Sequence, residues 1–540
     1  MQPPRSRRPA TRAVAALSAL CLIASCSANP GPPPLVEPES APSETSRVSA
    51  TPSDNNPRRS DRVQVQVGVD PVRGGFNPHL IADDTSTVRA IADLTLPSAY
   101  VGANPNKDLL VGVARLPTSP AAQTVRYVIA PEAQWSDGTP ISGSDFAYLW
   151  RGMVSTAGTV NPAAYRAIQA IRISGQGGKI VDVDFERPVA NREELFTHLL
   201  PSHLFAADAS DFAYALRHMV PASAGRFLMA DVGRARGTVV LNRNDRFWGA
   251  EPAAVDILTL TAARDTTQTA DQLRSGQFAF ADVTPQETTQ EVLSRVPGVE
   301  VREGSSSRVL GVVISATSGL DEAMREQVRS LIDVPLLAHI ATGRSTNLAV
   351  AEHTFTPGEK DTPALRERTV PIRVGADAMD PAAAAAARTL VDILNGADIP
   401  AKLTSTDATT LAGRSLPSSE VDLAVVWQRN SASMTTLASR MACPPKSWRS
   451  GNLSGLCSVG NEALAGKILA GTMSVAGAQA AVAEAEQRDA VWVPILNETR
   501  IAASSGGVVI PDVSTWPGGV SDAARWQLAD TVAPTPKEKP

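Results

Sequence analysis

Residues 127–146 read YVIAPEAQWSDGTPISGSDF, and this stretch decides the fold. It begins with Tyr127-Val128-Ile129, a short apolar run that ends before a proline, as strands commonly do. The pair Asp137-Gly138 is typical of a tight turn. Ser144 or Asp145 can then cap a helix whose apolar side chains recur at helical spacing, namely Phe146, Leu149, Trp150 and Met153. The stretch therefore predicts a strand, a turn and a helix in close succession.

Short strands separated by breaks continue on both sides of this stretch. Residues 63–69 alternate apolar and polar side chains with a period of two, which predicts a strand. Residues 167–174 and 179–185 flank Gly175-Gln176-Gly177-Gly178 and predict a β-hairpin. The glycines could also suggest a phosphate cradle, but a strand rather than a helix follows them, so we interpret them as a turn.

The C-terminal half has the alternation of an α/β lobe. A predicted helix begins at Asp380-Pro381, which supplies a capping carboxylate and a proline at the first helical position, and it ends at Gly396. Two further short helices are predicted upstream, at 321–331 and 333–343. The predicted strands of this half are 370–374, 401–406 and 422–427, and the last is apolar throughout, as in a buried parallel sheet. Strands alternating with helices in this way favour an α/β fold.

The stretch at 127–146 resembles the diagnostic segment of the family 5 extracellular solute-binding proteins, which serve ABC importers of oligopeptides, dipeptides and nickel. Further segments similar to this family follow in the expected order: Asn77-Pro78, 200–203 (LPSH), 241–249 (LNRNDRFWG), 273–276 (LRSG) and 328–333 (VRSLID). The resemblance spans residues 63 to about 505. It implies an α/β, two-lobed periplasmic-binding-protein fold of the Venus-flytrap type, with an extra subdomain on lobe I.

The resemblance also implies domain boundaries. Lobe I takes residues 61–97, 205–305 and 500–535, the extra subdomain takes 98–204, and lobe II takes 306–499. The chain would cross between the lobes twice, with hinge residues Arg302 and Arg308 at the first crossing and Thr499 and Ala503 at the second. Because clefts between domains are preferred ligand sites and hinge closure is common in binding proteins, we expect the ligand between the lobes.

One branch of this family, a cell-wall lipoprotein of mycobacteria, is similar at residues 75–80 (GFNPHL), 131–135 (PEAQW), 452–457 (NLSGLC) and 493–496 (VPIL). That closer resemblance implies one of two roles. The protein either handles a mannosylated phosphatidylinositol, or it regulates the branch between phosphatidylinositol mannosides and lipoarabinomannan.

The predicted cleft departs from the family in one respect. Peptide binders of the family carry an Asp three residues after a Trp that ends a lobe II strand, and this carboxylate pairs with the peptide's α-ammonium. Here the Trp is Trp427 and the matching residue is Asn430, which cannot supply the ion pair, and Arg429 beside it would repel an ammonium. Amide and guanidinium groups suit hydroxyls and phosphates better. The predicted cleft residues are Asn77, His79, Trp427, Gln428, Arg429 and Asn430, with Trp427 either a wall residue or a platform for a sugar.

The N-terminus predicts export. Arg5, Arg7, Arg8 and Arg12 precede an apolar run at 13–24, which is shorter than the roughly 20 residues that span a bilayer. Two small residues then lead into Cys26, an order that matches the bacterial lipobox, so residues 1–25 are a predicted signal peptide and Cys26 a predicted lipid anchor. The alternative is an ordinary secretory signal with a cysteine by chance. Residues 26–60 are rich in Pro and Ser and predict a disordered linker, and 536–540 form a tail.

Two cysteines remain once Cys21 leaves with the signal and Cys26 takes the lipid, and they are Cys443 and Cys457. A lone pair in an oxidising compartment usually forms a disulfide, and a zinc site would need further ligands that the neighbouring sequence lacks. The six histidines are scattered, and no motif for nucleophilic, metal-assisted or phosphoryl-transfer chemistry occurs. We therefore predict no catalytic residue, no metal and no cofactor.

The composition restricts the partners. Charged residues make up 19% of the 540-residue chain, and no Lys/Arg-rich block follows the linker, which argues against nucleic-acid binding. We expect an extracytoplasmic, lipid-anchored monomer that binds a glycolipid without catalysis. The alternatives are the receptor of an ABC permease for oligopeptides or a similar solute, and an empty-cleft scaffold that regulates a membrane mannosyltransferase.

Overall fold

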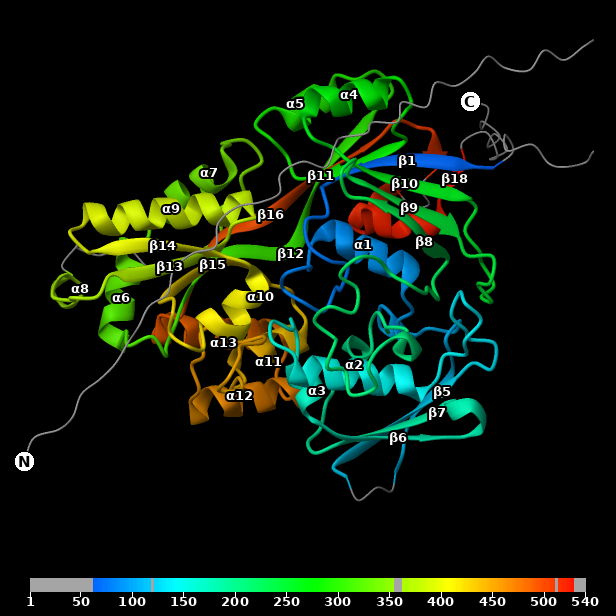
Figure 1. Cartoon of the computed structure of the whole chain (residues 1–540), viewed down its shortest axis with the longest axis horizontal. Coiled ribbons are helices and arrows are strands. Elements are labelled where there is room, and N and C mark those ends of the chain that lie inside the picture. Colours follow the sequence, from blue (N-terminus) through cyan, green and yellow to red (C-terminus); the bar gives the residue numbers. More distant parts are fainter. Residues whose placement is uncertain (1–61, 118–120, 354–361, 510–512, 529–540) are drawn as a thin grey trace, which may run out of the picture. The chain divides into compact units, whose positions relative to one another are not determined.

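The computed structural model describes residues 62–117, 121–353, 362–509 and 513–528. The predicted signal peptide, the predicted anchor at Cys26, the linker and the 536–540 tail lie outside these residues. The described chain contains a ten-stranded sheet and a four-stranded sheet with helices packed on them (Figure 1). No helix within the described ranges is both long and apolar enough to cross a membrane.

The ten-stranded sheet has the order β14-β13-β15-β12-β16-β11-β1-β10-β9-β8. Its strands are β1 (Gln64–Val69), β8 (Phe227–Gly233), β9 (Thr238–Arg243), β10 (Ile257–Ala262), β11 (Phe280–Val283), β12 (Glu300–Ile314), β13 (Ile372–Asp377), β14 (Ala401–Thr406), β15 (Leu423–Arg429) and β16 (Trp492–Ser504). Strand β1 pairs in parallel with β10 and β11, and β13 pairs in parallel with β14 and β15. The long strands β12 and β16 run antiparallel between these two halves and join them (Figure 1).

Each half of the sheet has its own hydrophobic core. One core gathers apolar side chains of β13, β14 and β15 with those of the helices α6 (Glu322–Leu331), α7 (Val334–Thr342) and α9 (Pro381–Gly396). A second, larger core joins β1, β8, β9 and β10 to the four-stranded sheet. Two cores around two parallel strand sets confirm the predicted α/β, two-lobed fold class.

The stretch 127–146 starts in β5 of the four-stranded sheet, whose order is β4-β5-β7-β6, and ends in the helix that follows. Its strands are β4 (Leu110–Arg115), β5 (Gln123–Ile129), β6 (Ile168–Ser174) and β7 (Ile180–Phe185), and the predicted β6–β7 hairpin is confirmed. Helix α2 (Gly143–Ser155) follows β5, but its cap was predicted wrongly. Ser142 is the N-cap, and Asp145 is the third helical residue, whose carboxylate accepts the Ser142 N–H in a capping box.

The helices α11 (Met434–Met441), α12 (Val459–Leu469) and α13 (Val475–Asp489) follow β15 in the sequence. Their buried side chains belong to the larger core, together with those of the four-stranded sheet, and not to the core around β13–β15. The segment that the sequence assigns to lobe II thus packs against both cores, and the lobe boundaries themselves remain predictions.

The other described elements are short or peripheral. The helices are α1 (Ser86–Thr95), α3 (Ala163–Arg166), α4 (Thr266–Arg274), α5 (Thr289–Ser294), α8 (Pro363–Arg366) and α10 (Ala408–Thr410), and the remaining strands are β2 (Tyr100–Val101), β3 (Asn104–Pro105), β17 (Val508–Val509) and β18 (Gln527–Leu528). A further helical segment, η5, covers Val513–Arg525.

Candidate functional site

A cavity of about 680 Å³ lies at the carboxyl ends of three strands, one from the parallel set that contains β1 and two from the set that contains β13, and the two sets run in opposite directions. Pro71 and Val72 follow the end of β1, Asp377 ends β13, and Asp407 follows the end of β14, and all four line the cavity. Ligands of open α/β sheets bind in the crevice outside the carboxyl ends of such strands. The volume falls within the roughly 300–1,000 Å³ of typical small-molecule sites. This cavity is therefore the candidate ligand site.

Two sets of residues face this cavity. One comes from the half that contains β1 and consists of 71–75, 80–83, Thr85, Val88, 213–214, Arg217, His218 and Arg234. The other comes from the half that contains β13 and consists of Asp377, Met379, Asp380, Ala383, 407–410 and 425–427. Arg308 of β12 joins them. The cavity thus lies between the two halves of the sheet.

The two walls carry opposite charge. Arg73, Arg217 and Arg234 outnumber the single carboxylate Asp83 on the first wall, and Asp377, Asp380 and Asp407 stand on the second. Burial raises the pKa of Asp377, and the nearby Asp380 and Asp407 carboxylates raise it further. Asp380 caps α9 by accepting the N–H groups of Ala382 and Ala383, both at 3.0 Å. The acidic wall is thus held by local backbone contacts.

Apolar side chains complete the cavity. Val425 and Trp427 of β15 contribute from the sheet, while Tyr214 and Met379 project from opposite walls with 61% and 64% of their surface exposed. In a cavity, exposed apolar side chains offer surface that a ligand can cover. The site combines aromatic surface with a few charged groups, as small-molecule sites do.

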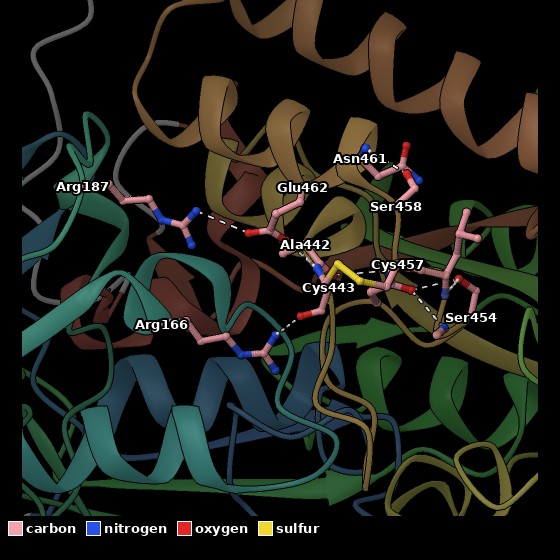
Figure 2. The surroundings of a disulfide bond; sticks show 12 residues. Arg166, Arg187, Ala442, Cys443, Ser454, Cys457, Ser458, Asn461 and Glu462 are labelled. Carbon is pink, nitrogen blue, oxygen red and sulfur yellow. Dashed lines mark hydrogen bonds and ion pairs between the residues drawn. A yellow bond between two sulfur atoms is a disulfide. The ribbon is translucent and has the colours of Figure 1, made fainter.

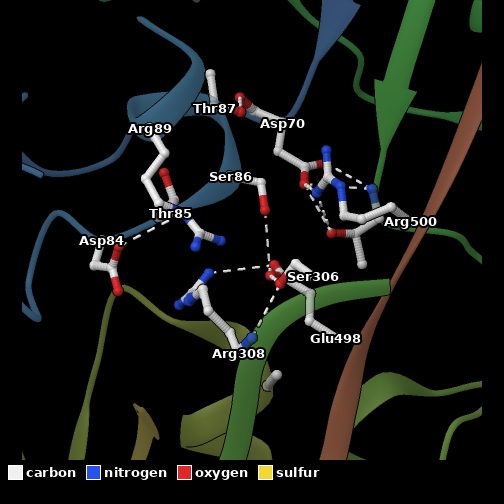
Figure 3. A network of polar contacts seen from close by, with 12 residues as sticks. Asp70, Asp84, Thr85, Ser86, Thr87, Arg89, Ser306, Arg308, Glu498 and Arg500 are labelled. Atoms are coloured by element: carbon white, nitrogen blue, oxygen red, sulfur yellow. Dashed lines mark hydrogen bonds and ion pairs between the residues drawn. The ribbon is translucent and has the colours of Figure 1, made fainter. Parts of the chain in front are cut away.

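Arg308 connects the cavity to the strands that join the two halves. Its guanidinium lies 4.8 Å from the centre of the Trp427 ring and donates to Glu498 Oε1 at 3.2 Å. Ser86 Oγ donates to Glu498 Oε2 at 3.3 Å, and Ser306 Oγ also donates to that oxygen (Figure 3). One carboxylate thereby ties the start of α1 to both central strands.

The predicted hinge residues lie on these central strands. Arg302 pairs with Ala502, Ala503 with Val301, and Thr499 with Ser305 in the β12–β16 register. The register then breaks, because the next pair is Val309 with Asn497, so three residues of β12 face Glu498 alone. Arg308 lies in this bulge, and in the β12–β15 register it stands opposite Arg429. Bulges bend strands locally, which fits the predicted hinge, although its movement remains a prediction.

Of the six predicted cleft residues, Trp427 lines the large cavity and the other five do not. Asn77 and His79 are buried: Asn77 Nδ2 donates to Phe212 O at 3.0 Å, and His79 Nε2 lies 3.0 Å from His198 O. Burial, and then the nearby His198, lowers the pKa of His79 to about 3, so its ring stays neutral. Both side chains serve the packing of the 75–80 loop.

The residues after Trp427 are also engaged. Arg429 forms two hydrogen bonds with the Asp84 carboxylate, at 2.9 and 2.8 Å, and a third to Pro78 O at 3.0 Å. Asn430 Oδ1 accepts a hydrogen bond from Arg440 at 2.9 Å. Gln428 lines two small cavities of about 20 Å³ each. These side chains meet protein groups in the positions where the sequence predicted a ligand.

Cys443 and Cys457 are joined by a disulfide, with their Cα atoms 4.7 Å apart (Figure 2). The disulfide lies beside residues that flank the four-stranded sheet. Arg166 of α3 donates to Cys443 O at 3.3 Å, and Arg187, which follows β7, forms an ion pair with Glu462 at 3.3 Å. Glu462 in turn accepts the Cys443 N–H at 2.8 Å. Within the described ranges, no group of three or more His, Cys, Asp or Glu side chains could hold a metal ion.

Sequence reasoning missed most of the cavity wall. Asp377 and Asp407 follow strands that the sequence did predict, so the strand-end rule could have found them. Tyr214 and Arg217 lie in an irregular segment without periodicity, and no local signal marks them.

Residues 113–392 match the sequence-family model described as bacterial extracellular solute-binding proteins, family 5 Middle. The chain is 30% identical over 499 residues to the probable monoacyl phosphatidylinositol tetramannoside-binding protein LpqW of Mycobacterium tuberculosis, a match that covers 80% of this chain and 77% of that protein. It is 27% identical over 300 residues to the oligopeptide-binding protein OppA of Mycobacterium bovis, with 53% of this chain and 50% of that protein covered.

Among solved structures, the fold is similar to that of the oligopeptide-binding protein AppA from Bacillus subtilis in complex with a nonapeptide. The TM-score is 0.65 at 12% identity, over 87% of this chain and 99% of that one. This similarity shows the fold alone. Together with the family match and the relation to LpqW, it places the chain: it belongs to the family 5 bacterial extracellular solute-binding proteins.

Proposed function

We propose that this protein binds the headgroup of a mannosylated phosphatidylinositol in the cavity between the two halves of its sheet, without catalysis. The 30% identity to LpqW over most of both chains supports this ligand class, since that relative is named as a probable monoacyl phosphatidylinositol tetramannoside-binding protein. The cavity has matching groups, because carboxylates accept hydrogen bonds from hydroxyls and guanidinium groups bind phosphate. Trp427 and Tyr214 add aromatic surface for the sugar rings.

The observation that carries the proposal is the engagement of Asn430. At the position where a peptide binder needs a carboxylate for the α-ammonium, Asn430 offers an amide whose oxygen already accepts from Arg440. Arg440 is in turn paired with Glu486, with Nε–Oε1 at 2.7 Å. A peptide ammonium placed beside Asn430 would find no free carboxylate there, because Glu486 is already paired with Arg440.

The setting of this activity is also proposed. We expect the acylated Cys26 to hold the protein at the outer face of the cell membrane, where the lipid ligand resides, and the protein to act as a monomer. Lobe II would move against lobe I at the β12–β16 bulge, with Arg302, Arg308, Thr499 and Ala503 around the bend.

A peptide or similar solute is the second candidate. The charges of the two walls would also suit a zwitterion, with its ammonium at Asp377 and its carboxylate on the arginine wall, and the partial similarity to OppA points in the same direction. In that case an ABC permease is the partner. A cavity that stays empty would instead support a scaffold that regulates a membrane mannosyltransferase.

Native mass spectrometry of the chain from residue 62 onward, purified from a mycobacterial host, separates these functions. A co-purified mannosylated phosphatidylinositol supports the proposal. A co-purified peptide supports the importer receptor and contradicts the proposal. An empty protein that titrates with neither deacylated phosphatidylinositol mannosides nor tripeptides, and that captures a mannosyltransferase from membranes, supports the scaffold.

A further inference from the structure

Four arginines line the cavity, and two of them are already engaged. Arg308 is paired with Glu498 and stacked on Trp427. Arg234 donates to Gly74 O at 2.9 Å and to Arg217 O at 2.7 Å, and it lies over the Phe76 ring at 5.7 Å. These two guanidinium groups hold the walls together, so they have few donors left for a ligand.

Arg217 differs from them. Its guanidinium lies 5.6 Å from the centre of the Tyr214 ring, within the range of a cation–π contact. Among the described residues it forms no ion pair, and the Asp83 carboxylate, on which its charge acts, accepts the N–H groups of Gly75 and Asn77 instead. Arg217 is therefore an exposed cation on the cavity wall with its charge uncompensated at contact distance.

The backbone of Arg217 is nevertheless fixed. Leu216 O accepts the Phe76 N–H at 2.9 Å, and Arg217 O accepts from Arg234. Gly75 packs so closely that a Cβ there would lie 3.1 Å from Arg217 Cα. Arg73, the fourth arginine, lies in the exposed loop after β1 and has no comparable contacts within the described chain. Preorganisation thus distinguishes Arg217 from Arg73.

A cation–π contact with a ring uses none of the N–H donors of a guanidinium. Its five N–H groups therefore remain available for the oxygens of a phosphate or carboxylate. Tyr214 is itself 61% exposed in the cavity, so it can steady the guanidinium and contact the ligand at the same time.

We propose that Arg217, steadied by Tyr214, is the specificity-determining residue that binds the anionic group of the ligand. The inference rests on the proposed use of this cavity. Its chemistry is that of a phosphodiester or a carboxylate, and the test below separates these two sources.

The test measures binding by calorimetry to the chain from residue 62 onward. The probes are glycerophosphoinositol mannosides, obtained by deacylating phosphatidylinositol mannosides, and mannose oligosaccharides without phosphate. A tripeptide with a free carboxylate and the same tripeptide amidated form a second pair. The variants are Arg217→Ala, Arg217→Lys and Tyr214→Ala, with Arg264→Ala as control, because Arg264 is exposed and lies outside the cavity lining.

We expect Arg217→Ala to weaken the phosphate-bearing probe about tenfold or more, the usual effect of losing a charge-assisted hydrogen bond. Arg217→Lys should recover part of that loss, Tyr214→Ala should weaken the same probe, and the phosphate-free mannosides and the Arg264→Ala control should be unaffected. Unchanged melting temperatures would show that the variants are folded.

The assignment is overturned if Arg217→Ala leaves the binding of the anionic probe unchanged, or if it weakens the binding of the charged and neutral probes equally. If the wild type binds the free tripeptide and not the mannosides, and Arg217→Ala weakens only the carboxylate form, the role of Arg217 stands and the proposed ligand fails. If the wild type binds none of the four probes, both fail.

Discussion

Asp84 and Arg429 form a two-point ion pair between segments that are 345 residues apart in the sequence, with N–O distances of 2.9 and 2.8 Å. Asp84 precedes α1, and Arg429 ends β15, so the pair joins one half of the sheet to the other. Arg89 approaches the same carboxylate at 3.6 Å (Figure 3). It also donates to Ser307 Oγ on β12 at 2.9 Å. The pair is thus a buried link between the two halves.

Removal of either partner should destabilise the protein. Asp84→Ala leaves the half-buried Arg429 without its counter-ion, and Arg429→Ala leaves the buried Asp84 with only the more distant Arg89. Breaking a buried pair in this way typically costs about 3–5 kcal/mol, and the partial exposure and the second cation place both variants towards the lower end. The double variant should lose less than the sum of the two, because neither charge is left alone. Urea unfolding of the three variants measures this coupling. Additive losses would contradict a direct Asp84–Arg429 interaction.

The same pair predicts a response to acid. Burial alone would raise the pKa of Asp84, but Arg429 and then Arg89 lower it to about 2. A carboxyl with a lowered pKa contributes stability above its unfolded value of 3.8, and that contribution is lost as the pH falls towards about 2. The stability difference between the wild type and Asp84→Asn should therefore be full at pH 5 and shrink by about 2 kcal/mol by pH 2. A difference that stays constant from pH 5 to pH 2 would argue against the pairing.

A second carboxylate, Glu194, caps a helix from a distant part of the chain. It accepts the N–H groups of Met434 and Thr435, at 3.1 and 2.9 Å, and the hydroxyl of Ser433 at 2.6 Å. Negative charge at a helix N-terminus is favourable, so Glu194→Gln should destabilise the protein by about 1 kcal/mol. Hydrogen exchange at residues 433–437 should rise, while Glu193→Gln serves as the neighbouring control. Equal effects of the two substitutions would contradict the capping role.

The disulfide closes a short loop beside this helix. Cys443 and Cys457 are 14 positions apart, and closing a loop of that length stabilises by about 3 kcal/mol in the chain-entropy model. The double variant Cys443→Ser/Cys457→Ser should therefore melt at a lower temperature, and a reducing agent should lower the melting temperature of the wild type alone. A wild type that melts at the same temperature with and without reductant would show that the bond contributes little.

Much of the fold follows from local sequence signals. Asp380-Pro381 begins α9 because the carboxylate caps the helix and the proline has no N–H to lose, and the glycine turn at 175–178 joins β6 to β7. Capping and turn residues act over only a few positions, so each helix or hairpin can be predicted from its own segment of sequence. The two-lobed class followed from the family resemblance that these segments carry.

The site was harder to predict from the sequence, because the role of each of its residues depends on partners that are distant in the chain. The sequence around Arg429 shows no partner for its charge, and only the fold brings Asp84 next to it. His79 lies in a family motif, yet its ring faces His198 O within the protein. Trp427 was predicted as a cleft residue because it matches the Trp that ends a lobe II strand in peptide binders of the family, whereas no such match marks Tyr214 and Arg217. Site residues that lie in irregular segments cannot be predicted from the periodicity of the sequence.

The position of Trp427 should allow ligand binding to be followed by tryptophan fluorescence. Its indole lines the cavity and lies 4.8 Å from the Arg308 guanidinium, so a bound ligand would change both its solvent contact and its local field. Titration with glycerophosphoinositol mannosides should change the tryptophan fluorescence of the wild type, and Trp427→Phe should remove most of that change. Trp248→Phe is the matched control, because Trp248 packs on Phe247 and donates to Asp108 O outside the cavity lining. A fluorescence change that survives in Trp427→Phe and disappears in Trp248→Phe would place the ligand elsewhere on the protein.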